Sequence, residues 1–413
     1  MNLSFILLYY LWVVMLSIKK LYIYIITFLI VINLNLLTFG DWTQLYRYIT
    51  SIISILLFVS VIGNRKIYSR IKSHMYFINI FFILLTIFII LEIMNGLISN
   101  QYGIITCIGK LYTFSWLLLI YPLIYIYSYN KGLLSIAKII TFFTIISLVM
   151  KSLIWLLFNN YGIDIMHYVL YEFGDEWMRD GNQRIPSTCF SGILFVVMLY
   201  LLDSNNNIFI KIFSIIIIMF NIWYANFVFA ARSQIITFII CLVIYVLFNN
   251  ISKMKKVFLI MLLFGISIYI INTEEFQLFI EGLSIDTYSI GIRFIAFDYY
   301  FNLFKDNYFL GISLSMNENL ISGSEGRFFL SDMGNIGNLI SYGILGYIIL
   351  ILPFIRMIYI SLKFKNNKMM YLRILLIYTV LFSLMSNDIY IKYYIFGLPF
   401  IWSIFEYRRM YSE

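Results

Sequence analysis

The sequence predicts an all-α, polytopic integral membrane helix bundle of about 12 or 13 spans with two larger external loops. Hydrophobic residues occupy 62% of the 413 positions and charged residues 12%, whereas a soluble domain is about 25% charged. The mean hydropathy is +0.91. Apolar stretches of about the 20 residues that cross a bilayer core recur along the chain. Lys and Arg gather in short loops on one side of these stretches, which predicts that those loops are cytoplasmic.

Two longer loops, at about 159–188 and 272–333, fall on the predicted external side and divide the chain. N-terminal spans occupy 1–158, central spans 189–271 and C-terminal spans 334–413. Thirteen spans place the N-terminus outside and the C-terminus inside, and the count becomes twelve if one end segment lies only at the interface. The candidate spans are 3–18, 21–38, 46–63, 75–93, 104–128, 135–158, 187–202, 208–227, 231–249, 256–272, 334–360, 371–386 and 391–406.

Ten of the 29 Lys and Arg residues lie against the charge bias. They fall in predicted external loops or within roughly two turns of the external surface. A cation in such a place is costly and marks a candidate functional site. The simplest common purpose is to hold an anion at the outer face. The ten are Arg47, Lys110, Lys151, Arg179, Arg184, Arg232, Arg293, Lys305, Arg327 and Lys392.

Arg232 and Arg293 are the strongest candidates among these cations. Arg232, in NFVFAARSQIITFII, is expected to open a span at the outer surface, and Arg293, in SIGIRFIAFDYY, a surface helix. A helix N-terminus offers free N–H groups and a positive dipole end to an anion, and an arginine there strengthens the site. Alternatively, the Arg232 side chain extends to the lipid headgroups, and Arg293 forms an ion pair with Asp298.

Lys110 and Lys151 are expected roughly 10 Å below the outer surface of two consecutive spans. They are candidates for lining one anion-binding cavity, although lysines at this depth can also extend to the interface. Arg184 and Arg327 lie in the two large loops. Each is a candidate for contacting a glycan or for simple surface exposure.

Asp332 lies where the second large loop re-enters the membrane, in SDMGNIGNLISYGILG. A carboxylate at a cavity mouth can act as a general base for an attacking hydroxyl. Alternatively, Ser331 or Asp332 caps the helix that follows. Four glycines recur in this segment and are candidates for close helix packing: Gly334, Gly337, Gly343 and Gly346.

The stretch RFIAFDYYFNLFKDN in the second loop has aromatic residues at helical spacing. One reading is a helix that lies on the membrane surface, and the other is a helix packed on the mouth of the bundle. The aromatic positions are Phe294, Phe297, Phe301 and Phe304.

Metal and nucleic-acid functions are not expected. Three scattered cysteines, Cys107, Cys189 and Cys241, have no metal-ligand spacing, and His74 and His167 lie far apart. The net charge of +9 comes from cytoplasmic cations and reflects topology and anionic lipid. We therefore expect no metal, no cofactor and no nucleic-acid partner.

The chain resembles the Wzy-type polysaccharide polymerases, of the superfamily that includes the O-antigen ligases. The similarity rests on AARSQ at the start of a span, then an Arg-bearing segment running into KDNYFLGISL, then SDMGNIGNLISYGILG. In the family these pieces read approximately SRG, R…kD.P..G.G and HN…E.G..G. AARSQ lacks the glycine after the arginine. The ligases carry His and Asn where this chain has Asp332 and Met333, which favours a polymerase.

The resemblance implies a glycosyltransferase of the bacterial cell (plasma or inner) membrane with an outward-facing active site. It would transfer a capsule- or O-antigen-type glycan from its undecaprenyl-diphosphate carrier to the next lipid-linked repeat unit, and Arg232 and Arg293 match the family arginines that bind the diphosphate. A chain-length regulator protein is a further possible partner. The alternatives are an O-antigen-type ligase and a lipid-linked oligosaccharide flippase, which is disfavoured because a transporter is expected to show two related halves.

Overall fold

The computed structural model describes residues 3–36, 42–99, 102–129, 131–163, 165, 178–179, 182–248, 288–312, 330–364, 369–385, 390 and 394–410. Only the backbone is described for 3–17, 42–43, 74, 99, 178–179, 232, 288–295, 331–332, 385 and 410. The span predicted at 256–272 and the site candidate Arg327 lie outside these residues.

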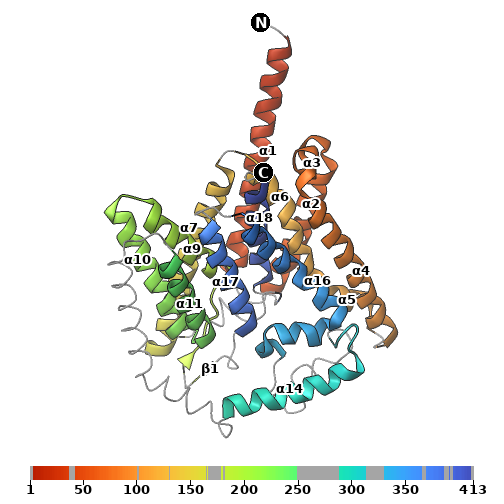
Figure 1. The fold of residues 1–413 in the computed structure, drawn as a ribbon, viewed down its shortest axis with the longest axis vertical. Coiled ribbons are helices and arrows are strands. Elements are labelled where there is room, and N and C mark those ends of the chain that lie inside the picture. The colour runs from red at the N-terminus through yellow and green to blue at the C-terminus, as the bar shows by residue number, and fades with distance from the viewer. Residues whose placement is uncertain are drawn as a thin grey trace. The chain divides into compact units, whose positions relative to one another are not determined.

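The predicted all-α membrane bundle is confirmed (Figure 1). Within the described residues, six helices are long and apolar enough to cross a membrane. They are Gln44–Gly63, Tyr76–Ile98, Ile104–Tyr127, Gly132–Tyr161, Ile208–Val228 and Asn335–Lys363, and three shorter apolar helices accompany them at Ser191–Ser204, Ser233–Phe248 and Met369–Leu384.

The chain forms two compact units, of which unit 1 combines 1–76, 112–230 and 392–413. Its core includes the indole of Trp116, which donates a hydrogen bond of 2.8 Å to Ser51 Oγ. Its elements are α1 (Leu3–Asn33), α2 (Trp42–Gly63), α3 (Arg65–Ile71), η1 (Lys72–His74), η2 (Tyr112–Leu119), α6 (Ile120–Tyr127), α7 (Gly132–Tyr161), β1 (Met178–Arg179), β2 (Asn182–Gln183), α9 (Ser191–Ser204), α10 (Ile208–Trp223), the π-helix η4 (Tyr224–Val228), η6 (Ile395–Gly397) and α18 (Leu398–Met410).

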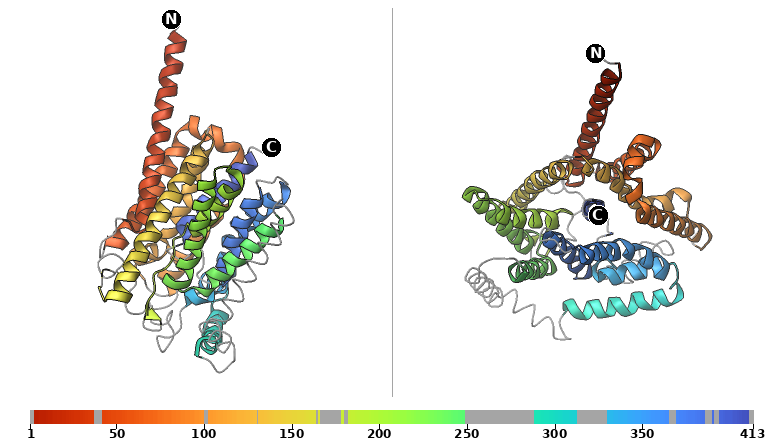
Figure 2. Two further views of the ribbon diagram at one scale, coloured as in Figure 1. Left: turned by 90° about the vertical axis from the view of Figure 1, so that its left-hand side faces the viewer. Right: turned by 45° about the horizontal axis from the view of Figure 1, so that its top comes forward.

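Unit 2 combines 77–111 and 231–391. Here α11 and α17 lie side by side (Figure 2), with the rings of Phe238 and Tyr378 stacked at 5.2 Å. The elements are α4 (Tyr76–Ser99), α5 (Ile104–Leu111), α11 (Arg232–Phe248), α14 (Tyr288–Asp306), η5 (Leu330–Met333), α16 (Asn335–Lys363) and α17 (Met369–Met385).

The division of the N-terminal segment into two spans, 3–18 and 21–38, is wrong. One helix, α1, runs from Leu3 to Asn33 through Lys19 and Lys20. Lysine is a good helix former, and the segment has no proline or glycine to end the helix. Two adjacent charges therefore mark an interruption in hydropathy without interrupting the backbone hydrogen bonds.

Candidate functional site

Helix α16 is broken at Gly343, whose φ of 66° and ψ of −177° are not helical. The break is bridged by the turn that follows α14. The N–H groups of Ile344 and Leu345 donate to the carbonyl oxygens of Tyr308 (2.9 Å) and Phe309 (3.3 Å), and the N–H of Ile312 donates to Ile340 O (3.0 Å). A membrane helix can be interrupted only where other groups satisfy its backbone, and such breaks line cavities and binding sites in membrane proteins.

The glycines of this segment allow backbones to approach closely, as the sequence predicted. A Cβ on Gly334 would lie 2.7 Å from Leu384 O, and one on Gly337 would lie 2.6 Å from Leu330 O. A Cβ on Gly346 would lie 2.6 Å from Cζ of Phe88. At Gly343 it would overlap the Phe309 carbonyl. Close packing favours glycine at these positions, and at Gly334 (φ 56°) and Gly343 (φ 66°) the positive φ requires it as well.

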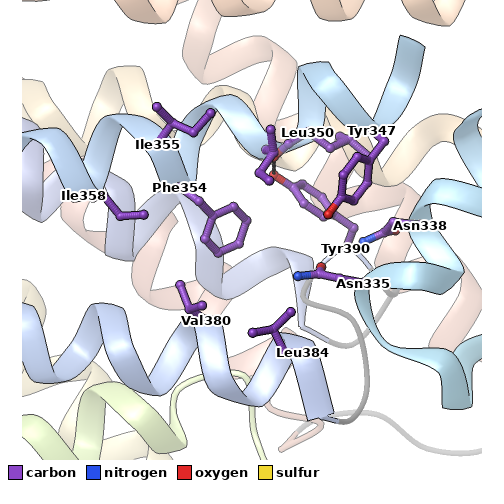
Figure 3. Close-up of a pocket in the computed structure, with 11 residues that line it drawn as sticks. Asn335, Asn338, Tyr347, Leu350, Phe354, Ile355, Ile358, Val380, Leu384 and Tyr390 are labelled. Carbon is purple, nitrogen blue, oxygen red and sulfur yellow. Dashed lines mark hydrogen bonds between the residues drawn. The ribbon is translucent and has the colours of Figure 1, made fainter. Parts of the chain in front are cut away.

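A cavity of about 170 Å³ runs along α16 and α17 within unit 2. Asn335 and Asn338 lie at one end of it and apolar side chains line the rest (Figure 3). Ser383 donates a hydrogen bond of 2.8 Å to Asn335 Oδ1 and so holds that amide in place. The shape suits an apolar chain that carries a polar group at one end. The apolar lining comprises Leu350, Ile351, Phe354, Ile355, Ile358, Val380 and Leu384, and Tyr347 and Tyr390 complete it.

Helix α14 packs by one face on η5 and the start of α16. Ala296, Tyr300 and Phe304, at intervals of four residues, are buried in this cluster with Ile312, Leu330 and Ile340. Phe297 and Phe301 stack on each other at 5.4 Å, and Phe301 stays exposed. The reading of a helix packed on other helices is therefore confirmed for the Phe304 face, and the membrane-surface reading remains a prediction for the Phe301 face.

Asp332 lies in η5, the turn enclosed between α14 and α16. Its side chain is not among those described. The N-cap position of α16 is Gly334, so neither Ser331 nor Asp332 occupies it. The base role of Asp332 stays a prediction.

The expectation that Arg293 opens its helix is wrong. α14 begins at Tyr288, so Arg293 lies beyond the first turn and its N–H is not one of the free N-terminal groups. Gly291, inside the segment Tyr288–Ile292, does not stop the helix, because one glycine costs only about 1 kcal/mol there. Arg293 stays one turn before the buried Ala296, on the helix that packs against η5.

Arg232 is the first residue of α11, as predicted from AARSQ. Ala230, two residues earlier, has a φ of 50° and completes the tight turn after the π-helix. The start of α11 is fixed by the buried Gln234, whose Nε2 donates to Tyr378 Oη at 2.9 Å. The side chain of Arg232 itself is not described.

Lys151 lies within unit 1, ten residues before the end of α7, which is about 15 Å along the helix. Its side chain is buried and Nζ donates to the carbonyl of Pro186 at 3.2 Å. Tyr224 Oη donates to the carbonyl of Ile185 at 3.1 Å. No carboxylate of the described residues pairs with the Lys151 ammonium.

Two other candidate cations, Arg184 and Lys110, make local contacts in the structure. Arg184 Nε donates to the carbonyl of Phe229 at 3.1 Å, which ties the segment after β2 to the end of the π-helix. The ammonium of the half-buried Lys110 lies 4.7 Å from the ring centre of Tyr102, consistent with a lysine that extends toward its helix start. Lys110 and Lys151 belong to different units, so the single cavity proposed for both stays a prediction.

Sequence reasoning missed Glu92, a fully buried carboxyl inside α4. The signal was present, because Glu92 is the single charge in IFIILEIMNG. It also missed Trp155, which lies one turn after Lys151 on α7, and Ser187, which follows Pro186, the residue whose carbonyl accepts from Lys151. Neither Trp155 Nε1 nor Ser187 Oγ has a hydrogen-bond partner in the described part of the chain.

Within the described residues, no group of three or more His, Cys, Asp or Glu side chains could hold a metal ion. Comparison with known proteins adds no assignment. Neither a family model nor a curated protein sequence matches this chain.

Proposed function

We propose that this protein is a membrane glycosyltransferase that polymerises oligosaccharide repeat units at the outer face of the bacterial cell membrane. It transfers a glycan from an undecaprenyl-diphosphate carrier to the next lipid-linked repeat unit.

The observation that carries this proposal is the uncompensated ammonium of Lys151. An ammonium has three N–H donors, and the carbonyl of Pro186 accepts one of them. A buried cation without a countercharge is costly, and a bound anion would relieve that cost. The unused donors of Trp155 and Ser187 support an anion with several oxygen atoms, as a diphosphate has.

Two features of unit 2 support a lipid-linked substrate. The cavity beside α16 has amides at one end and an apolar wall, which suits an isoprenoid chain with a polar head. The exposed ring of Phe301 on α14 is suited to the membrane interface.

The reaction needs a base and stabilisation of the leaving group. The acceptor hydroxyl attacks the anomeric carbon, its proton passes to Asp332, and the bond from that carbon to the diphosphate oxygen breaks with the electron pair remaining on oxygen. Fixed cations in a poorly solvated site stabilise the charge that develops there. We assign that role to Arg232 and Arg293, and Lys151 stays a further candidate for binding the diphosphate.

The test is polymer synthesis by purified, reconstituted protein supplied with lipid-linked repeat units. Lys151→Met should lower turnover by about 10²-fold, the effect of removing one preorganised charge donor. Lys138→Met, an exposed lysine on the same helix, is the matched control and should keep wild-type activity. Full activity of the Lys151→Met protein would show that Lys151 does not bind the diphosphate.

The same assay separates the alternatives. Product that forms only after a different acceptor is added indicates a ligase. Movement of the lipid-linked glycan across the vesicle membrane without any new glycosidic bond indicates a flippase, and either result rejects the polymerase.

A further inference from the structure

Glu92 lies on the buried face of α4, which we call the seam and whose other residues are apolar or small. The residues of α4 that are buried with it recur every three or four positions and are hydrophobic or small: Ile78, Phe81, Leu85, Phe88 and Gly96. The exposed fraction of Glu92 is 0% and neither carboxyl oxygen has a hydrogen-bond partner among the described residues. A polar group in such a place is a candidate functional site.

The seam places Glu92 beside the break in α16. Phe88 contacts Gly346, and its ring packs edge-on against Tyr342 with the ring centres 6.1 Å apart. Helices α4 and α16 run in opposite directions (Figure 1). Glu92 lies one turn after Phe88, about 6 Å along α4, and Gly343 lies about 4.5 Å before Gly346. The carboxyl is therefore at the level of Gly343.

The surroundings can hold this carboxyl only as a neutral acid. An ionised carboxylate in an apolar interior without a partner is very costly, so the group binds a proton instead. Near Glu92, α16 brings the titratable Tyr342 to the seam, and further along Arg356 of α16 lies over the ring of Phe77, fifteen residues before Glu92. None of the described Lys, Arg or His side chains pairs with Glu92. No cluster of the described acidic or sulfur residues offers a metal ion further ligands. The ligand that fits is a proton.

We propose that Glu92 is a proton-binding site inside the membrane-spanning part of unit 2, and that its proton is exchanged during the working cycle. An unsatisfied buried acid is costly relative to an apolar residue of the same shape. A carboxyl at this position therefore lowers the stability of the fold. A role in proton exchange beside the broken helix α16 accounts for a residue that lowers stability.

The first test does not depend on activity. Dicyclohexylcarbodiimide, an apolar reagent, reacts with a protonated carboxyl: the acid proton moves to a reagent nitrogen, the carboxyl oxygen bonds to the central carbon, and acyl migration gives a stable N-acylurea. Mass spectrometry should locate this adduct on Glu92 at neutral pH, decreasing as pH is raised, and Glu92→Gln should remove it. Glu406 is the matched control: it is equally buried, but Arg409 Nε donates to its Oε2 at 3.0 Å, so this carboxyl is held in an ion pair and should be labelled less than Glu92. An unlabelled Glu92 would overturn proton binding, and labelling that does not fall as pH is raised would overturn proton exchange.

The second test rests on the proposed polymerase activity. Glu92→Gln keeps the shape and removes the exchangeable acid, so turnover should fall by about 10²-fold, as for a lost proton-transfer group. Glu92→Asp keeps the acid and should retain part of the activity. Wild-type turnover by Glu92→Gln would reject proton exchange. If wild-type protein makes no polymer, the proposed function fails and the labelling still decides whether Glu92 binds a proton.

Discussion

Replacement of Gly343 by alanine should destabilise the protein severely. A non-glycine residue at this φ and ψ costs about 1–3 kcal/mol. The added Cβ would also overlap the Phe309 carbonyl and lie 2.6 Å from Gly311 N, and backbone atoms cannot move aside as a flexible side chain can. Separating α16 from this turn breaks the hydrogen bonds of Ile344 and Leu345, each of about 1 kcal/mol. The expected loss in the free energy of unfolding is about 3–5 kcal/mol, which is unusually large for one substitution.

Two other glycines isolate the parts of this effect. Gly162 also has a positive φ, of 65°, but its Cβ would meet nothing within 4 Å, so alanine there should cost only about 1–2 kcal/mol. Gly103 has neither constraint, and its replacement should change stability by less than about 0.5 kcal/mol.

The assay is thermal unfolding of each purified variant in one detergent, followed by intrinsic tryptophan fluorescence and by recovery of monodisperse protein. We expect Gly103→Ala to be the most stable variant, Gly162→Ala to be less stable, and Gly343→Ala to be the least stable. A Gly343→Ala protein as stable as Gly103→Ala would show that the break in α16 and its bridging turn do not exist as described.

Three further predictions concern the proposed site. Arg232→Ala and Arg293→Ala should each lower polymer synthesis by about 10²-fold at equal expression. Arg→Lys at either position should also impair synthesis, because Lys lacks the planar bidentate fork of Arg. Synthesis at the wild-type rate would show that the replaced arginine does not bind the diphosphate. Asp332→Asn should abolish turnover while lipid-linked substrate still binds, whereas near-normal polymer would reject the base role. A cysteine in place of Ser324 should react with an impermeant thiol reagent in intact cells, and labelling only after membrane disruption would contradict an external second loop.

The sequence by itself determined that this is a helical membrane protein and where most spans lie. Runs of about 20 apolar residues have few alternatives, because a backbone in lipid must satisfy its own hydrogen bonds. AARSQ correctly located the start of α11, since a tight turn and a polar residue interrupt the apolar pattern there. The four glycines correctly indicated close packing around α16.

Only the tertiary structure decided what those segments do with one another. Hydropathy separates 3–18 from 21–38, yet α1 is continuous because helix hydrogen bonds do not depend on side-chain charge. The break at Gly343 depends on Tyr308 and Phe309, which are distant in sequence, to supply the missing acceptors. The isolation of Lys151 and Glu92 is likewise a property of what surrounds them in space. A sequence shows which groups are costly to bury, and only packing decides which of them are left without a partner.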